Sequence, residues 1–69
     1  MPETVARLVI ETERETDGRW IAEVPALAGV LAYGATREEA IARVQALALR
    51  VLAERGEPTG ELEGLFEAA

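Results

Sequence analysis

The sequence has no cysteine and no histidine, and these two absences exclude several kinds of site. Without cysteine the chain forms no disulfide, no thiolate nucleophile and no cysteine-ligated zinc site. Without histidine it lacks the side chain that most often acts as a general base near neutral pH. Serine is absent as well, which removes the usual hydroxyl nucleophile. The sequence therefore predicts a protein that is not an enzyme and needs no cofactor or metal.

Long apolar runs are also missing. No stretch approaches the roughly 20 apolar residues that span a bilayer, and no basic segment precedes an apolar one as in a secretory signal. We therefore expect a cytoplasmic protein with no membrane contact. The net charge of −6 disfavours direct nucleic-acid binding and suits a basic protein partner.

The chain is short for a stable domain. Its 69 residues make a single domain, 1–69. A domain of this size buries only roughly 60% of its unfolded surface, and without disulfides the usual further source of stability is association. A homodimer or higher homo-oligomer is therefore expected.

One helix, over about 37–54, is the clearest prediction. Thr36 is predicted to cap its first turn, with Glu39 as the return partner of a capping box. Gly56 suits the position just after the last turn. Positive φ at the preceding Gly34 would make larger residues costly there. One side of the helix is apolar at steps of three and four, so the helix packs on another layer; its members are Ala40, Ile41, Val44, Leu47, Ala48, Val51 and Leu52.

Strands are predicted around this helix. Alternating polarity indicates strands at about 4–13 and 19–24, joined by a turn at Asp17 and Gly18. Further strands are expected at about 30–33 and, more weakly, at 62–67. The predicted fold is a two-layer α+β domain, β-β-β-α-β, with a mainly antiparallel sheet of strand order 3-2-1-4 and one helix packed on one face.

Several apolar residues are candidates for contacts with a partner or a second copy; they are Trp20, Leu31, Tyr33, Ala42, Ala46, Leu49 and Ala53. Trp20 suits a partner contact, but core packing or self-contact is favoured in a domain with so few aromatics. The last four form a second apolar strip on the helix. Either the alanines simply favour helix formation or the strip is a contact surface. The apolar third strand offers an edge for pairing.

Carboxylates alternate along the first strand. Glu11, Glu13 and Glu15 share one side, and Glu23 lies on the second strand. A metal-dependent nuclease needs such carboxylates on adjacent strands. We favour a solvated charged face, because hard-cation sites usually include Asp and the one Asp is in a turn.

The spacing of turn and cap residues resembles the HicB antitoxin family; the matching positions are Asp17-Gly18, Trp20, Val24-Pro25, Leu27, Gly29, Gly34, Thr36, Glu39 and Ala40. The match covers about half to two-thirds of the chain. The resemblance implies a partial ribonuclease-H-like domain that neutralises a small basic HicA-like ribonuclease toxin. Many family members also carry a C-terminal DNA-binding segment. Only eleven residues follow Pro58 here, so operator binding is not expected.

The sequence thus predicts an antitoxin-like module that occludes the RNA-binding surface of a basic toxin. The alternative is a small homo-oligomeric structural or interaction protein without a toxin. A neighbouring reading frame for a short basic protein with a catalytic histidine distinguishes the two.

Overall fold

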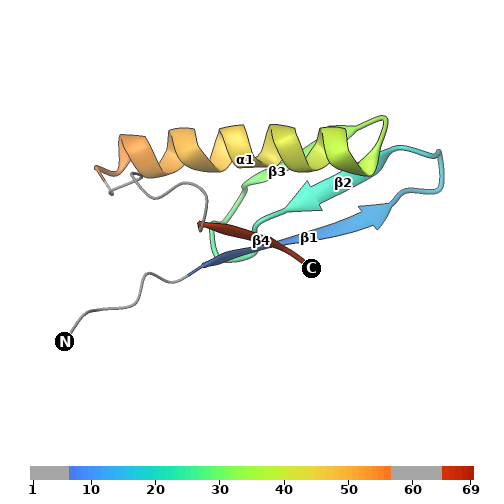
Figure 1. Cartoon of the computed structure of the whole chain (residues 1–69). Coiled ribbons are helices and arrows are strands. Elements are labelled where there is room, and N and C mark those ends of the chain that lie inside the picture. Colours follow the sequence, from blue (N-terminus) through green and yellow to red (C-terminus); the bar gives the residue numbers. More distant parts are fainter. Residues whose placement is uncertain (1–6, 57–64) are drawn as a thin grey trace.

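The computed structural model describes residues 7–56 and 65–69, which form one sheet with one helix over it (Figure 1). The elements are β1 (Leu8–Arg14), β2 (Trp20–Glu23), β3 (Leu31–Gly34), α1 (Arg37–Glu54) and β4 (Phe66–Ala68). The four strands have the order β3-β2-β1-β4. β2 is antiparallel to β1 and to β3, whereas β4 runs parallel to β1. The predicted α+β fold and strand order are confirmed.

Element bounds differ from the predicted ones by small amounts. α1 has the predicted bounds, and β2 and β3 differ from the predicted strands 19–24 and 30–33 by one residue at each end. β2 stops at Glu23 because the chain then turns: the N–H of Leu27 donates to the carbonyl of Val24. Residues 4–6 of the predicted strand 4–13 and residues 62–64 of the predicted strand 62–67 lie outside the described residues.

The core lies between α1 and one face of the sheet. Along β1, Ile10 is buried while its neighbours Val9 and Glu11 are exposed, as the alternation of a half-covered strand requires. The buried apolar residues are Ile10, Ala22, Val24, Leu27, Val30, Ala40, Val44, Ala48, Leu52 and Leu65. Alanines at two helix positions allow α1 to lie close to the strands.

α1 is capped at both ends. The hydroxyl of Thr36 accepts from the N–H of Glu39 at 3.0 Å. The predicted capping box has Glu39 accepting a hydrogen bond from the N–H of Thr36. This prediction is wrong by one residue, because the Glu39 carboxylate accepts from the N–H of Ala35 at 2.6 Å. The extended backbone at Thr36 brings the preceding amide within reach of that carboxylate. At the other end Gly56 has φ 77°, and its N–H donates to Ala53.

Arg37 ties the start of the helix to the sheet. Its Nε donates to the hydroxyl of Thr12 in β1, and its Nη2 donates to the carbonyl of Ala69 just after β4, each at 3.2 Å. The helix therefore contacts both of the parallel strands through one side chain. Within the described ranges, no helix has the length and apolar character that crossing a membrane requires.

The Thr36 cap gives a first testable prediction. Thr36→Ala is expected to lower the free energy of unfolding by roughly 0.5–2 kcal/mol, because the N–H of Glu39 loses its acceptor. Urea unfolding followed by circular dichroism measures the change. Thr16→Ala, an exposed threonine in the β1–β2 turn, is the control and should leave the midpoint in place. Equal midpoints for both variants would show that the cap contributes nothing.

Candidate interaction surface

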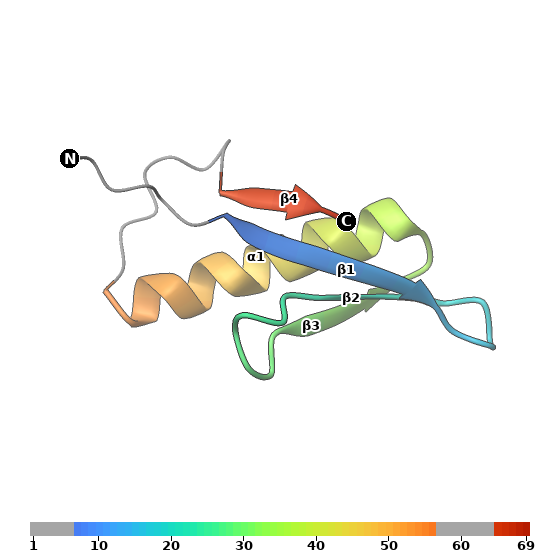
Figure 2. The ribbon, with the colours of Figure 1, turned by 90° about the horizontal axis from the view of Figure 1, so that it is seen from below.

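The sheet face opposite α1 is uncovered in the described structure, and we call it the outer face. In Figure 2 the sheet is seen from this side, with the helix behind it. The strand register places side chains of this face next to one another. Glu11 is opposite Glu23, and Glu13 is opposite Ile21. Further across, the partners are Ile21 with Tyr33, Glu23 with Leu31, and Val9 with Glu67.

Apolar side chains are exposed on the outer face. Val9, Leu31 and Tyr33 are 40%, 39% and 38% exposed, and they are the exposed large hydrophobic residues of the described part of the chain. Ile21 lies between Glu13 and Tyr33 and is half-buried. All these side chains point to the side without a helix. Exposed apolar groups gathered on one face mark a surface suited to contacts.

Carboxylates occupy the rest of this face. Glu11, Glu13, Glu23 and Glu67 are all exposed. Arg7 Nη1 lies 4.0 Å from Glu67 Oε1, an exposed pair that contributes little to stability. Within residues 7–56 and 65–69, no group of three or more Asp or Glu side chains is arranged to hold a metal ion.

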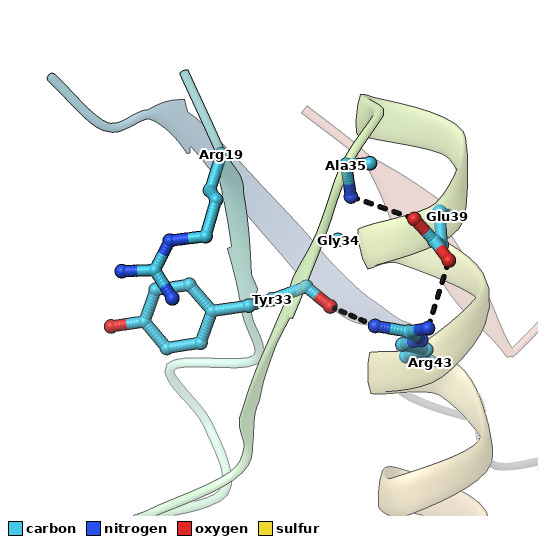
Figure 3. Close-up of a pocket in the computed structure, with 6 residues that line it drawn as sticks. All are labelled: Arg19, Tyr33, Gly34, Ala35, Glu39 and Arg43. Atoms are coloured by element: carbon cyan, nitrogen blue, oxygen red, sulfur yellow. Dashed lines mark hydrogen bonds and ion pairs between the residues drawn. The ribbon is translucent and has the colours of Figure 1, made fainter. Parts of the chain in front are cut away.

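Tyr33 carries a stacked arginine. The guanidinium of Arg19 lies over its ring, 4.5 Å from the ring centroid, and both side chains point away from α1 (Figure 3). Arg19 Nε also donates to Asp17 Oδ2 at 2.8 Å. The backbone N–H of Arg19 donates to Asp17 Oδ1 and, together with the guanidinium, lowers the pKa of that carboxyl. At this exposed site the cation over the ring contributes a weak attraction.

The open edge of β3 is partly closed by the helix. Arg43 Nη1 donates to the carbonyl of Tyr33 at 2.9 Å, while Arg43 Nη2 pairs with Glu39 at 2.8 Å (Figure 3). These side chains and Arg19 line a shallow, open hollow of about 380 Å³. Both arginines already contact a carboxylate, so the hollow is not a free anion site. The edge that was predicted to invite pairing thus has one carbonyl already occupied.

The other candidate residues lie elsewhere. Trp20 is half-buried and packs against the core, opposite Gly34 in β3. On the helix, Ala42, Ala46 and Ala53 are exposed, but Leu49 is half-buried and packs against the core. Leu49 therefore has a reason for being apolar that needs no partner.

Sequence reasoning missed two members of the outer face, Val9 and Ile21. The signal was present, because strand alternation places them on the same side as Glu11 and Glu23. They were not selected because alternation alone does not say which face the helix covers.

Comparison of the chain with protein-family models, with curated proteins and with solved structures finds no match. The resemblance to the HicB family therefore stays a prediction. The geometry of the surface has to carry any functional conclusion.

Asp17 provides a test of the turn beside Tyr33. Its carboxyl is expected to titrate below the ordinary Asp pKa, chiefly because the Arg19 N–H donates to the ionised form. Since the folded-state pKa is lowered, any stability from this group is present at neutral pH and lost as pH falls through that pKa.

The measurement is an NMR titration of the Asp17 carboxyl carbon. In Arg19→Gln the pKa should rise but stay below the ordinary value, because the backbone bond remains. A pKa in the native chain at or above that of the urea-unfolded chain would contradict the assignment.

Proposed function

We propose that this chain is an antitoxin-like protein-binding module that neutralises a small basic ribonuclease by covering its RNA-binding surface. The observation that carries the proposal is the uncovered outer face. No element of the described structure covers the sheet face opposite α1. The exposed large hydrophobic residues of the described chain lie on this face. A surface of this composition suits a protein partner better than solvent.

Charge supports a basic partner. The whole chain has a net charge of −6, and the outer face carries four exposed glutamates. Complementary charge speeds encounter and selects against acidic partners. A ribonuclease that binds RNA needs a positively charged surface, so one contact would supply both affinity and occlusion. For the same reason we propose that the chain itself does not bind nucleic acid.

The chemistry of the chain supports binding over catalysis. With no His, Cys or Ser, it lacks the usual bases and nucleophiles. The hydroxyl of Thr36 is engaged as a helix cap. We therefore propose that the carboxylates of β1 and β2 serve recognition.

The proposal is tested by co-expression. If a short basic protein is encoded beside this chain, it is expressed alone and together with the chain, and growth and RNA integrity are followed. Growth arrest with RNA cleavage is expected from the basic protein alone, and recovery when both are present. Purified chain should also block cleavage in vitro. A neighbouring protein that neither binds the chain nor cleaves RNA, or the lack of such a neighbour, overturns the proposal.

A self-associating protein without a toxin is the second candidate, favoured by the open edge of β3. Leu31 and Tyr33 are exposed on this edge strand, although Arg43 already occupies one carbonyl there. We predict at least a homodimer in light scattering at micromolar concentration, and Leu31→Lys should shift it to monomer. Leu49→Glu tests the helix strip in the same way. A monomer mass for the unmodified chain would refute the prediction.

A further inference from the structure

The outer face divides into two unlike halves. The apolar half lies on β2 and β3, and the acidic half lies on β1 and the end of β2. The apolar half consists of Ile21, Leu31 and Tyr33, with Arg19 stacked on the Tyr33 ring, and the acidic half of Glu11, Glu13 and Glu23. Outside both halves, the exposed Val9 of β1 is paired with Glu67 of β4. Because neighbouring strands hold both halves, their relative position is fixed by the register of the sheet.

The acidic half places two like charges opposite each other. Glu11 and Glu23 are direct cross-strand partners, so their Cβ atoms lie about 5 Å apart on the same face. Like charges in this position destabilise a sheet. The ion pairs found within residues 7–56 and 65–69 include neither carboxylate. The folded chain thus keeps a repulsion that one cation placed between the two groups would remove.

We propose that the outer face docks a basic protein whose arginine or lysine side chain enters between Glu11 and Glu23. Apolar side chains of the same partner cover Ile21, Leu31 and Tyr33. This inference rests on the proposed function in one respect only, which is that the basic partner is a toxin. A second copy suits this face less well than a basic protein, because the exposed glutamates of each outer face outnumber its arginines, Arg7 and Arg19. The partner is therefore defined by positive charge beside an apolar patch.

The experiment uses random short peptides displayed on phage and selected against the immobilised full chain. Enriched peptides should combine arginine or lysine with apolar residues. A synthetic copy of the best peptide is then titrated into labelled chain and followed by NMR. Amide shifts are expected along β1, β2 and β3, with little change along α1. Acidic or uncharged peptides, or shifts concentrated on the helix, overturn the proposal.

Charge variants supply a readout that a purely structural role would not give. Glu11→Gln and Glu23→Gln should each raise the urea midpoint of the free chain, because the repulsion is relieved. Each should also weaken peptide binding roughly tenfold, because a charge contact is lost. Glu38→Gln on α1 changes the net charge equally and should do neither. Equal weakening by all three variants would mean that only net charge matters, and the docking surface would be wrong.

The same variants show whether the docking surface or the proposed function is wrong. If the toxin is neutralised as well by Glu11→Gln and Glu23→Gln as by the unmodified chain, the function stands and this surface is wrong. If the peptides dock as expected but no toxin is found, the surface stands and the function is wrong. If the variants increase the dimer fraction in light scattering, the face is a contact between copies and the proposal fails.

Discussion

A chain carrying Gly34→Ala is expected to lose about 3 kcal/mol of unfolding free energy, the upper part of the usual range for overpacking. A Cβ built on Gly34 would lie 2.5 Å from the backbone nitrogen of Ala40 and 3.0 Å from its Cα. Those atoms belong to the first turns of α1, so the clash is relieved only by moving the helix off β3. For a domain of this length the thermal midpoint should fall by about 12–24 °C, and Gly34→Val should leave the chain largely unfolded.

Gly18→Ala is the matched control. Gly18 has φ +92° and nothing within 4 Å of the added carbon, so its cost is backbone strain alone. That cost is roughly 1–2 kcal/mol. Thermal and urea unfolding by circular dichroism compare the two. A smaller loss at Gly34 than at Gly18 would show that α1 does not approach β3 as closely as described.

The position of Gly34 corrects the sequence interpretation. A positive φ was the expected reason for glycine there, but among the described glycines positive φ occurs at Gly18, Gly29 and Gly56 only. Glycine is required at Gly34 because the helix backbone occupies the space that a side chain would need. Sequence alone gives no access to this, since the contact joins two elements whose separation depends on the packed core.

The second large effect is expected where α1 meets the sheet. Ala48 is fully buried, and Ala48→Leu adds three carbon atoms to a site without room for them. The expected loss is about 2–3 kcal/mol. Ala46→Leu makes the same change on the exposed side of α1 and should stay within about 0.5 kcal/mol. Urea unfolding curves measure both.

This pair also tests the apolar strip on the helix. If Ala46→Leu lowers stability as much as Ala48→Leu, the rotation of α1 about its axis is wrong. If Ala46→Leu leaves stability unchanged but increases the mass in light scattering, the strip is a contact surface after all.

The fold was accessible from sequence because its signals are local. The Thr36 cap, the apolar spacing from Ala40 to Leu52 and the turn at Gly18 depend on neighbouring residues, and the structure contains all of them. The Glu39 bond shows the limit of this reasoning. Its acceptor role was predicted, but the choice of Ala35 as donor depends on the path of the loop before the helix.

The candidate surface was less accessible. Alternation placed Glu11, Glu13 and Glu15 on one side of the first strand and Glu23 on the second strand, but it did not show that Glu11 stands opposite Glu23. That pairing depends on the register of two strands. The stacking of Arg19 on Tyr33 and the bond from Arg43 to the Tyr33 carbonyl depend on three-dimensional proximity across elements. Predicting a binding surface requires the strand register and the contacts between elements, and local sequence patterns do not give either.

The parallel pairing of β4 with β1 has a consequence for the order of folding. β1, β2, β3 and α1 follow one another in the chain and make contacts between neighbours in sequence, which form early because little chain has to be ordered first. Leu8 and Phe66 are partners although nearly the whole chain separates them. Because closing a longer loop costs more chain entropy, we expect this pairing to form last. On this expectation β1 has an unpaired edge until β4 arrives. The two hydrogen bonds from Arg37, to Thr12 and to Ala69, then stabilise the completed sheet.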